Sequence, residues 1–240
     1  MRETFRMALV AAARNEAAYL TDWVFHHLRY GFSPIRVVVN RSDDATLEIG
    51  RRIAARHDDV SVVDAGHPGP KANPQLMAYR AARRDWRRRL DRHDQMMCID
   101  IDEFWTPDDF TSTIQDVLDA AGRPRRSAYA WYRDFSDTRP FAPPFSAEMA
   151  GRMHPMVKSA FRLDLPVLRL MQHGVDTLWP APIWSASGEP MQRFRHHRTR
   201  DTPARTGRAF VVHRMFRSPV EYLAMLGRGR PAHEDRLFKD

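Results

Sequence analysis

Cysteine, lysine and long apolar runs are scarce in this chain of 240 residues. The single cysteine, Cys98, excludes an internal disulfide, and its apolar surroundings predict a buried, inert thiol in a reducing cytoplasm. The longest apolar run, Met7 to Ala13, falls short of the roughly 18 residues that a membrane span needs and fits a buried strand instead. With 43% hydrophobic and 28% charged residues, the chain has the composition of a soluble globular protein.

Positive charge is unevenly distributed along the chain. The formal net charge is +8, and residues 190–240 hold twelve lysines and arginines against five aspartates and glutamates, so the first 189 residues are close to neutral. Such a basic segment favours an anionic partner: a pyrophosphate, an acidic glycan, a membrane surface or nucleic acid. Because only three of the 38 basic residues are lysines, an arginine-rich proteome is the competing explanation.

Strand and helix patterns alternate through the first hundred residues. That order predicts an α/β protein whose mostly parallel sheet is flanked by helices. Ligands of such sheets bind at the carboxyl ends of the strands, so the loops after Ala13, Asn40, Asp64 and Asp100 are expected to line one crevice. The predicted strands are residues 5–13, 35–40, 60–64 and 95–100, and the predicted helices are residues 17–30, 46–56 and 75–89.

The pattern becomes irregular after Arg123, in the C-terminal part of the chain. No linker divides the sequence, so we predict a single domain over residues 1–240. The elements expected in this part are a strand at 127–133, strands or extended chain at 156–170, a strand ending at His213 and a helix at 219–227.

The strongest chemical signal is the segment MMCIDIDEFW, in which an apolar strand runs into Asp100, Asp102 and Glu103. The period of a strand puts Asp100 and Asp102 on the same side, where two like charges repel. A divalent cation resolves that conflict, and carboxylate oxygens suit Mg²⁺ or Mn²⁺. The alternative is a solvated acidic turn that caps a helix beginning near residues 106–109.

Polar side chains also follow the first two predicted strands. Asn15 and Glu16 come where the first strand gives way to a helix, whose N-terminus offers free amide donors to a base or ribose. Asn40 and Asp44 follow the second strand. The alternative for all four is a structural role, because these residue types are also common in helix caps and turns.

A histidine and several arginines follow the late apolar strand in FVVHRMFRSPVEYLAMLGRGRP. His213 ends the strand and is a candidate to complete a metal site with the acidic segment. Arg217, Arg228 and Arg230 are candidates to bind phosphates through paired hydrogen bonds. The alternative is a structural histidine beside a solvated basic face.

Five segments, taken in order, resemble the glycosyltransferase family 2-like group, close to the family 92 proteins. The resemblance spans roughly residues 5–230 and implies a GT-A fold, with a nucleotide-binding half at about 1–105 and an acceptor-binding part at about 106–240. It further implies a nucleotide-sugar donor, Mn²⁺ or Mg²⁺, a glycan or lipid-linked acceptor, and inverting transfer. The segments are ARNEAAYLTDWVFHHLRYGF, NRSDDAT, QLMAY, IDIDEFW and HRMFRSPVEYLAMLGRGRP.

The resemblance also implies roles for individual residues. Glu103 would support the two aspartates, and Lys158, in the segment MVKSAFR, would be a supporting residue near the acceptor. The chain departs from the group at Val39, where an acidic residue is usual, so the identity of the nucleotide stays open. The residues expected to bind the nucleotide-sugar are Asn15, Glu16, Asn40, Asp44, Gln75, Asp100 and Arg217, and those expected to bind metal are Asp100, Asp102 and His213.

A catalytic base is needed to deprotonate the acceptor hydroxyl in an inverting transfer. Asp134, Asp137, Glu148 and His173 are the candidates, and Asp137 is preferred.

Two other functions fit parts of the sequence. A nucleotidyltransferase of the same fold class would carry a glycine-rich loop after its first strand, and AAARNEAAY has no glycine. A non-enzymatic binder of nucleic acid or other anions would use stretches such as residues 80–92, which hold seven arginines. We see no nucleic-acid-binding motif and expect no nucleic-acid partner, whereas a peripheral membrane contact through the basic C-terminal segment stays open.

Overall fold

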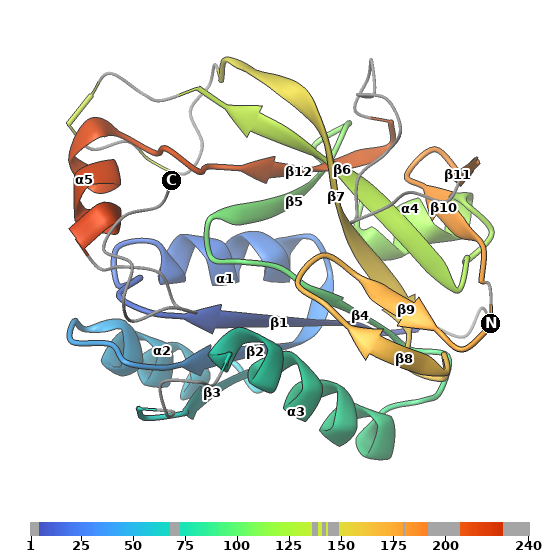
Figure 1. Ribbon diagram of the computed structural model, residues 1–240, viewed down its shortest axis with the longest axis horizontal. Coiled ribbons are helices and arrows are strands. Elements are labelled where there is room, and N and C mark those ends of the chain that lie inside the picture. Colours follow the sequence, from blue (N-terminus) through green and yellow to red (C-terminus); the bar gives the residue numbers. More distant parts are fainter. Residues whose placement is uncertain are drawn as a thin grey trace.

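The computed structural model describes residues 5–67, 73–135, 139–140, 143, 149–179, 181–191 and 207–227 (Figure 1). Its first half alternates strands with helices: β1 (Met7–Ala13), α1 (Leu20–Arg29), β2 (Phe32–Val39), α2 (Thr46–Ala54), β3 (Val60–Asp64), α3 (Pro74–Arg89) and β4 (Gln95–Cys98). The second half holds β5 (Glu103–Pro107), α4 (Ile114–Ala120), β6 (Arg126–Asp134), β7 (Gly151–Arg162), β8 (Val167–Leu170), β9 (Val175–Thr177), β10 (Ile183–Ser185), β11 (Pro190–Met191), β12 (Ala209–His213) and α5 (Pro219–Gly227).

The main sheet has the strand order β11-β10-β6-β7-β4-β1-β2-β3, and β12 joins it by pairing with β5 and β6. Strands β4, β1, β2 and β3 run parallel, so their carboxyl ends meet at one edge. Helix α3 lies on one face of this sheet, and α1 and α2 lie on the other (Figure 1). The predicted α/β class, with a mostly parallel sheet flanked by helices, is therefore confirmed.

Strand β1 is an uninterrupted apolar run because both of its faces are buried at the centre of the sheet. Its alternate residues enter different cores: Leu9 packs in the core under α1, while Val10 packs in the core under α3. A parallel strand covered on both faces needs apolar residues at every position, and MALVAAA supplies them. Cys98 of β4 lies in the α3 core and is buried, as expected.

The structure differs from the sequence prediction after the acidic segment. Residues 103–107 form strand β5, so the helix start predicted near 106–109 is wrong. The next helix, α4, begins after Thr113, whose side chain accepts from the Asp116 amide in a capping box. Residues 151–162 form one long strand, β7, which pairs antiparallel with both β4 and β6. Among the described residues, no helix is long and apolar enough to cross a membrane.

Candidate functional site

The acidic segment lies at the carboxyl end of β4, and helix α1 holds it from behind. The indole of Trp23, which is fully buried, donates to the carbonyl oxygens of Asp100 (3.0 Å) and Glu103 (2.9 Å). One turn later, His27 accepts from the Trp105 amide at 3.2 Å, and burial keeps its pKa well below the ordinary value. A neutral imidazole can accept this bond, so helix α1 fixes both ends of the acidic turn.

Lys158, on β7, joins two of the carboxylates. Its ammonium is fully buried and contacts Glu103 Oε2 at 2.9 Å and Asp100 Oδ2 at 3.2 Å. It also donates to the carbonyl oxygen of Gln172 at 3.1 Å, so all three of its hydrogen-bond donors have acceptors. The side chain of Glu103 is 0% exposed whereas that of Asp100 is 33% exposed, so only Asp100 presents its carboxylate to solvent.

Burial and opposite charge act against each other in this cluster. Burial raises the pKa of Glu103 to about 7, although the nearby Lys158 ammonium opposes that shift. Burial also disfavours the charged form of Lys158, but the carboxylates of Asp100 and Glu103 outweigh it and raise the pKa of the lysine above its ordinary value. Lys158 therefore stays charged, and burial holds the pKa of Glu103 well above its ordinary range.

Polar side chains from two further elements orient Asp100. The amide nitrogen of Gln75, at the start of α3, donates to Asp100 Oδ1, and the hydroxyl of Tyr79 donates to the same oxygen at 3.2 Å. Gln172 in turn donates to Gln75 Oε1 at 2.7 Å. Burial, followed by the Asp100 charge, raises the pKa of Tyr79 well above its ordinary value, so it remains a donor. Sequence reasoning missed Tyr79 and Gln172, which no local pattern distinguishes from core and loop residues.

Asp102 meets His213 from the far end of the sequence. His213 ends β12 opposite Glu103 of β5, and its Nε2 lies 3.7 Å from Asp102 Oδ2. The two side chains are 9% and 8% exposed. The ring of Trp131 lies against His213, with centroids 4.1 Å apart. Among the described residues, His213 Nδ1 is buried without a hydrogen-bond partner.

A divalent cation is the group that the predicted function would require here. Within the described part of the chain, no three histidine, cysteine, aspartate or glutamate side chains gather as a complete metal site. Asp102 and His213 fit as two ligands, an oxygen and a nitrogen, for an ion that takes its other ligands from diphosphate and water. Asp100 differs, because both of its oxygens already face Lys158, Tyr79 or Gln75.

The turn between β1 and α1 is held by the side chains that follow β2. Asn15 has a positive φ of 52° and takes the place that a glycine would often occupy. Its amide donates to Ser42 Oγ at 3.0 Å, and the next two amides donate to Thr46 Oγ1 at 2.8 Å and Asp44 Oδ2 at 3.0 Å. The prediction that free amides face a ligand here is therefore wrong for residues 15–17. Asn40 is buried and donates to the Ala13 carbonyl at 3.3 Å.

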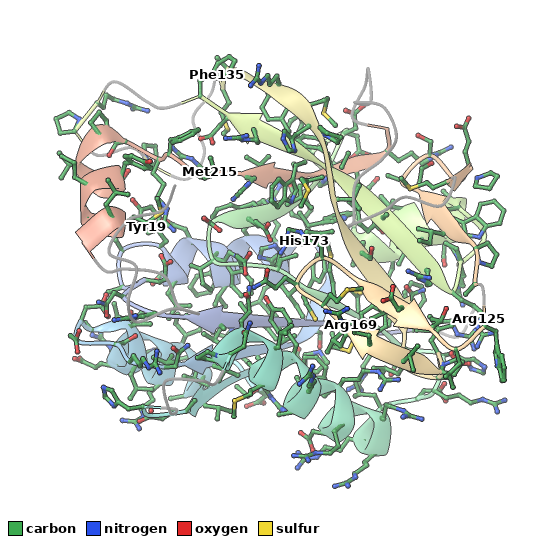
Figure 2. The ribbon with its side chains drawn as sticks, viewed as in Figure 1. Tyr19, Arg125, Phe135, Arg169, His173 and Met215 are labelled. Carbon is green, nitrogen blue, oxygen red and sulfur yellow. The ribbon has the colours of Figure 1, made fainter. Side chains whose placement is uncertain are left out.

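Glu16 and Arg217 form a buried ion pair across the molecule. Arg217 Nη2 lies 2.9 Å from Glu16 Oε2, and the two side chains are only 5% and 6% exposed. The guanidinium also lies 3.8 Å from the ring centre of Tyr19 (labelled in Figure 2). Glu16 and Arg217 therefore bind each other. The pair joins the segment after β12 to the turn between β1 and α1.

Two of the four candidate bases lie within the described residues. Asp134 is buried in an ion pair with Arg214 at 2.9 Å. His173 lies near the middle of the view in Figure 2, and its ring centroid is 5.3 Å from that of Trp131. The preferred base, Asp137, lies outside the described residues, as do Glu148, Arg228 and Arg230.

No protein-family model and no curated protein sequence matches the chain. One similar solved structure is a 4-diphosphocytidyl-2C-methyl-D-erythritol synthase, with 12% identity and a TM-score of 0.41 over 68% of this chain and 78% of that one. A second is S. aureus TarS 1-349 in complex with UDP-GlcNAc, with 13% identity and a TM-score of 0.38 over 80% of this chain and 60% of that one. A third is the mannosyltransferase PcManGT from Pyrobaculum calidifontis in complex with GDP-Man and Mn²⁺, with 20% identity and a TM-score of 0.34 over 57% of this chain and 37% of that one. The chain thus spans less than two thirds of the TarS and mannosyltransferase chains, and likenesses at these TM-scores give no residue a role.

Proposed function

We propose that the protein is a metal-dependent glycosyltransferase that moves a sugar from a nucleotide-sugar to a hydroxyl of a glycan or lipid-linked acceptor, with inversion. The observation that carries the proposal is the meeting of Asp102 with His213, 3.7 Å apart, at the carboxyl edge of the parallel strands. The acidic segment is followed by a strand, so its carboxylates do not cap a helix. Capping of a following helix therefore does not account for them.

In this proposal Asp102 and His213 hold the cation. A divalent ion there would offset the negative charge of the departing nucleoside diphosphate. Asp100 would accept a hydrogen bond from the donor sugar or ribose, since its carboxylate is the exposed member of the cluster. Lys158 holds the Asp100 carboxylate in place, and Glu103 fixes the turn by accepting from the Asp100 amide at 2.9 Å.

The acceptor would bind on the side of His173 and Trp131. Trp131 is buried and packs against both His173 and His213, so it holds the two histidines on one side of the crevice. Asp134 is occupied by Arg214, so His173 is the described candidate for taking the proton of the acceptor hydroxyl. Asp137 stays the preferred base from the sequence.

A nucleotidyltransferase is less consistent with the first βα turn. A triphosphate-binding loop exposes backbone amides to the phosphates. Here the amides of Asn15, Glu16 and Ala17 are already bound by side chains of the following loop.

A ligand-dependent stability assay tests the proposal. UDP-, GDP-, CMP- and TDP-sugars are added with and without Mn²⁺ to wild type, Asp102→Asn and the control Asp58→Asn, an exposed aspartate between α2 and β3. Binding at a hundred times the dissociation constant stabilises by about 2.7 kcal/mol, which corresponds to a rise in Tm of roughly 5–10 °C. We expect one nucleotide class to give this rise with Mn²⁺, in wild type and the control alone.

Release of nucleoside diphosphate with an acceptor present then separates transfer from binding. A shift that is equal with and without metal, or that survives in Asp102→Asn, would contradict the metal site. Pyrophosphate release from a nucleoside triphosphate would instead identify a nucleotidyltransferase.

A further inference from the structure

The second half of α3 presents a row of exposed arginines, and Arg88 of this row is close enough to Asp85 to help lower the pKa of that carboxyl. A groove of about 520 Å³ separates this row from β8 and is lined by five arginines of α3 and three apolar residues of β8. Arg80, Arg84, Arg87 and Arg88 are exposed, and none of them forms an ion pair within the described part of the chain. Asp85, the acidic residue of this helix, is instead paired with Arg36 and Arg89.

This arrangement opposes the stability of the helix. Arg80 and Arg84 are four residues apart, as are Arg84 and Arg88, and like charges at that spacing on a helix repel. An anionic partner would relieve this repulsion.

Three large apolar side chains stand out from the neighbouring β8–β9 hairpin. Leu168 is 67% exposed, Leu178 is 54% exposed and Trp179 is 70% exposed. They belong to one structural unit, because Val167 pairs with Thr177 and the Leu178 amide donates to the Pro166 carbonyl at 2.9 Å. The hairpin lies beside α3 (Figure 1), and Leu168 lines the same groove as the arginines. Arg169, on this hairpin, lies at the lower right of the view in Figure 2.

We propose that the arginine row of α3 and the apolar ridge of Leu168, Leu178 and Trp179 together form a docking face for a membrane that contains anionic phospholipids. Arginines near such a surface are attracted by its negative potential, while tryptophan and leucine enter the interfacial layer. A soluble polyanion bound in the groove would meet the arginines and Leu168. It would not reach Leu178, and Trp179 lines a second hollow of about 350 Å³ with Pro166 and Trp184, next to the same hairpin.

The C-terminal end of the arginine row lies far from the candidate site, although the hairpin that carries Leu168 also carries Gln172. Gln75, which orients Asp100, lies at the beginning of α3, and Arg88 lies thirteen residues later, about 20 Å along the helix. A docked protein would therefore keep the crevice open beside the membrane. The inference holds whether or not the chain transfers sugar, because none of its residues contacts the acidic cluster.

Cosedimentation with vesicles tests the docking face. Wild type is mixed with vesicles of phosphatidylcholine alone or with phosphatidylglycerol added, at low and high salt. We expect binding only to the anionic vesicles, weakened by salt. Arg84→Gln with Arg88→Gln should lower the partition coefficient about 25-fold, since each charge near the surface contributes roughly fivefold. Trp179→Ser should lower it further and remove any blue shift of fluorescence on binding.

The matched control is Arg52→Gln with Arg56→Gln, which removes two exposed arginines at the same spacing near α2. Equal losses in the two double variants would show attraction by net charge alone and overturn the assignment of this face. No preference for anionic vesicles would overturn it as well. Binding to heparin or RNA that survives in the Trp179 variant, without vesicle binding, would replace it with a polyanion groove. Donor-dependent thermal shifts in the same variants report separately on the proposed transferase.

Discussion

Replacing Lys158 by methionine is expected to destabilise the fold by an amount that grows above neutral pH. Methionine has a similar volume but leaves the carboxylates of Glu103 and Asp100 without their cation. Removing one partner of a buried ion pair costs about 3–5 kcal/mol. Asp100 is 33% exposed and keeps its bonds from Gln75 and Tyr79, so Glu103, with a side chain 0% exposed, accounts for most of the loss.

The direction of the pH dependence follows from Glu103. Its pKa in the folded protein is raised from 4.5 to about 7, so the folded state holds a proton that the unfolded state has lost. Its contribution to stability is therefore present below pH 4.5, falls as the pH rises to about 7, and then levels off. Without Lys158 the pKa of Glu103 rises further, so the fall continues above neutrality at about 1.4 kcal/mol per pH unit. The stability deficit of the variant should widen between about pH 7 and pH 9.

Urea unfolding of wild type and Lys158→Met at several pH values measures this deficit. Adding Glu103→Gln to the variant should recover most of the loss at high pH, because the amide keeps the volume and can still accept from the Asp100 amide. A deficit that is the same at every pH, or a double variant no more stable than Lys158→Met, would refute the reasoning.

Three further substitutions probe the contacts that hold the site. Trp23→Phe removes the indole bonds to two carbonyl oxygens of the acidic turn and should cost about 1–3 kcal/mol in urea unfolding, with weaker donor binding in the thermal-shift assay. Arg217→Met leaves Glu16 buried without its partner and should cost about 3 kcal/mol; adding Glu16→Gln should restore most of it, and a failure to do so would contradict the ion pair. Asn15→Gly and Asn15→Ala both remove the Asn15 Oδ1 that accepts from the Asp43 amide at 2.8 Å, so Asn15→Ala should be about 1 kcal/mol less stable than Asn15→Gly, because φ is 52° there.

The sequence predicts the first half of the fold well, and the reason is physical. Strands covered on both faces need continuous apolar runs, and helices covered on one face need apolar residues with a period near 3.6. Both patterns can therefore be recognised in a short stretch of sequence. The predicted strand 60–64 coincides with β3, and the predicted helix 75–89 differs from α3 by one residue at its start. The carboxyl-edge position of Asp100 and Asp102 followed from the same reasoning.

The contacts within the site cannot be recognised from any short stretch of sequence. The Glu16–Arg217 pair joins residues 201 positions apart, and Lys158 meets Asp100 across 58 positions. Each residue alone is typical of a helix start or an exposed surface, and lysine in particular is rarely fully buried. Only the pairing of β7 with β4 brings the Lys158 side chain under the acidic turn. The roles assigned from the resemblance therefore stay predictions until ligands are tested.

His213 offers a test that separates a ligand from a structural side chain. Its place beside Asp102 is set by the backbone, since β12 pairs with β5 from Ala209 opposite Pro107 to His213 opposite Glu103, and a slip of one residue would turn the histidine to the other face. Because this pairing does not depend on the imidazole, the strand should stay in register in His213→Gln, and the lost packing against Trp131 should lower the free energy of unfolding by about 1–2 kcal/mol. The same variant should lose the Mn²⁺-dependent part of the donor shift. If the free energy of unfolding falls by several kcal/mol while the Mn²⁺-dependent donor shift persists, the ring serves packing against Trp131 instead.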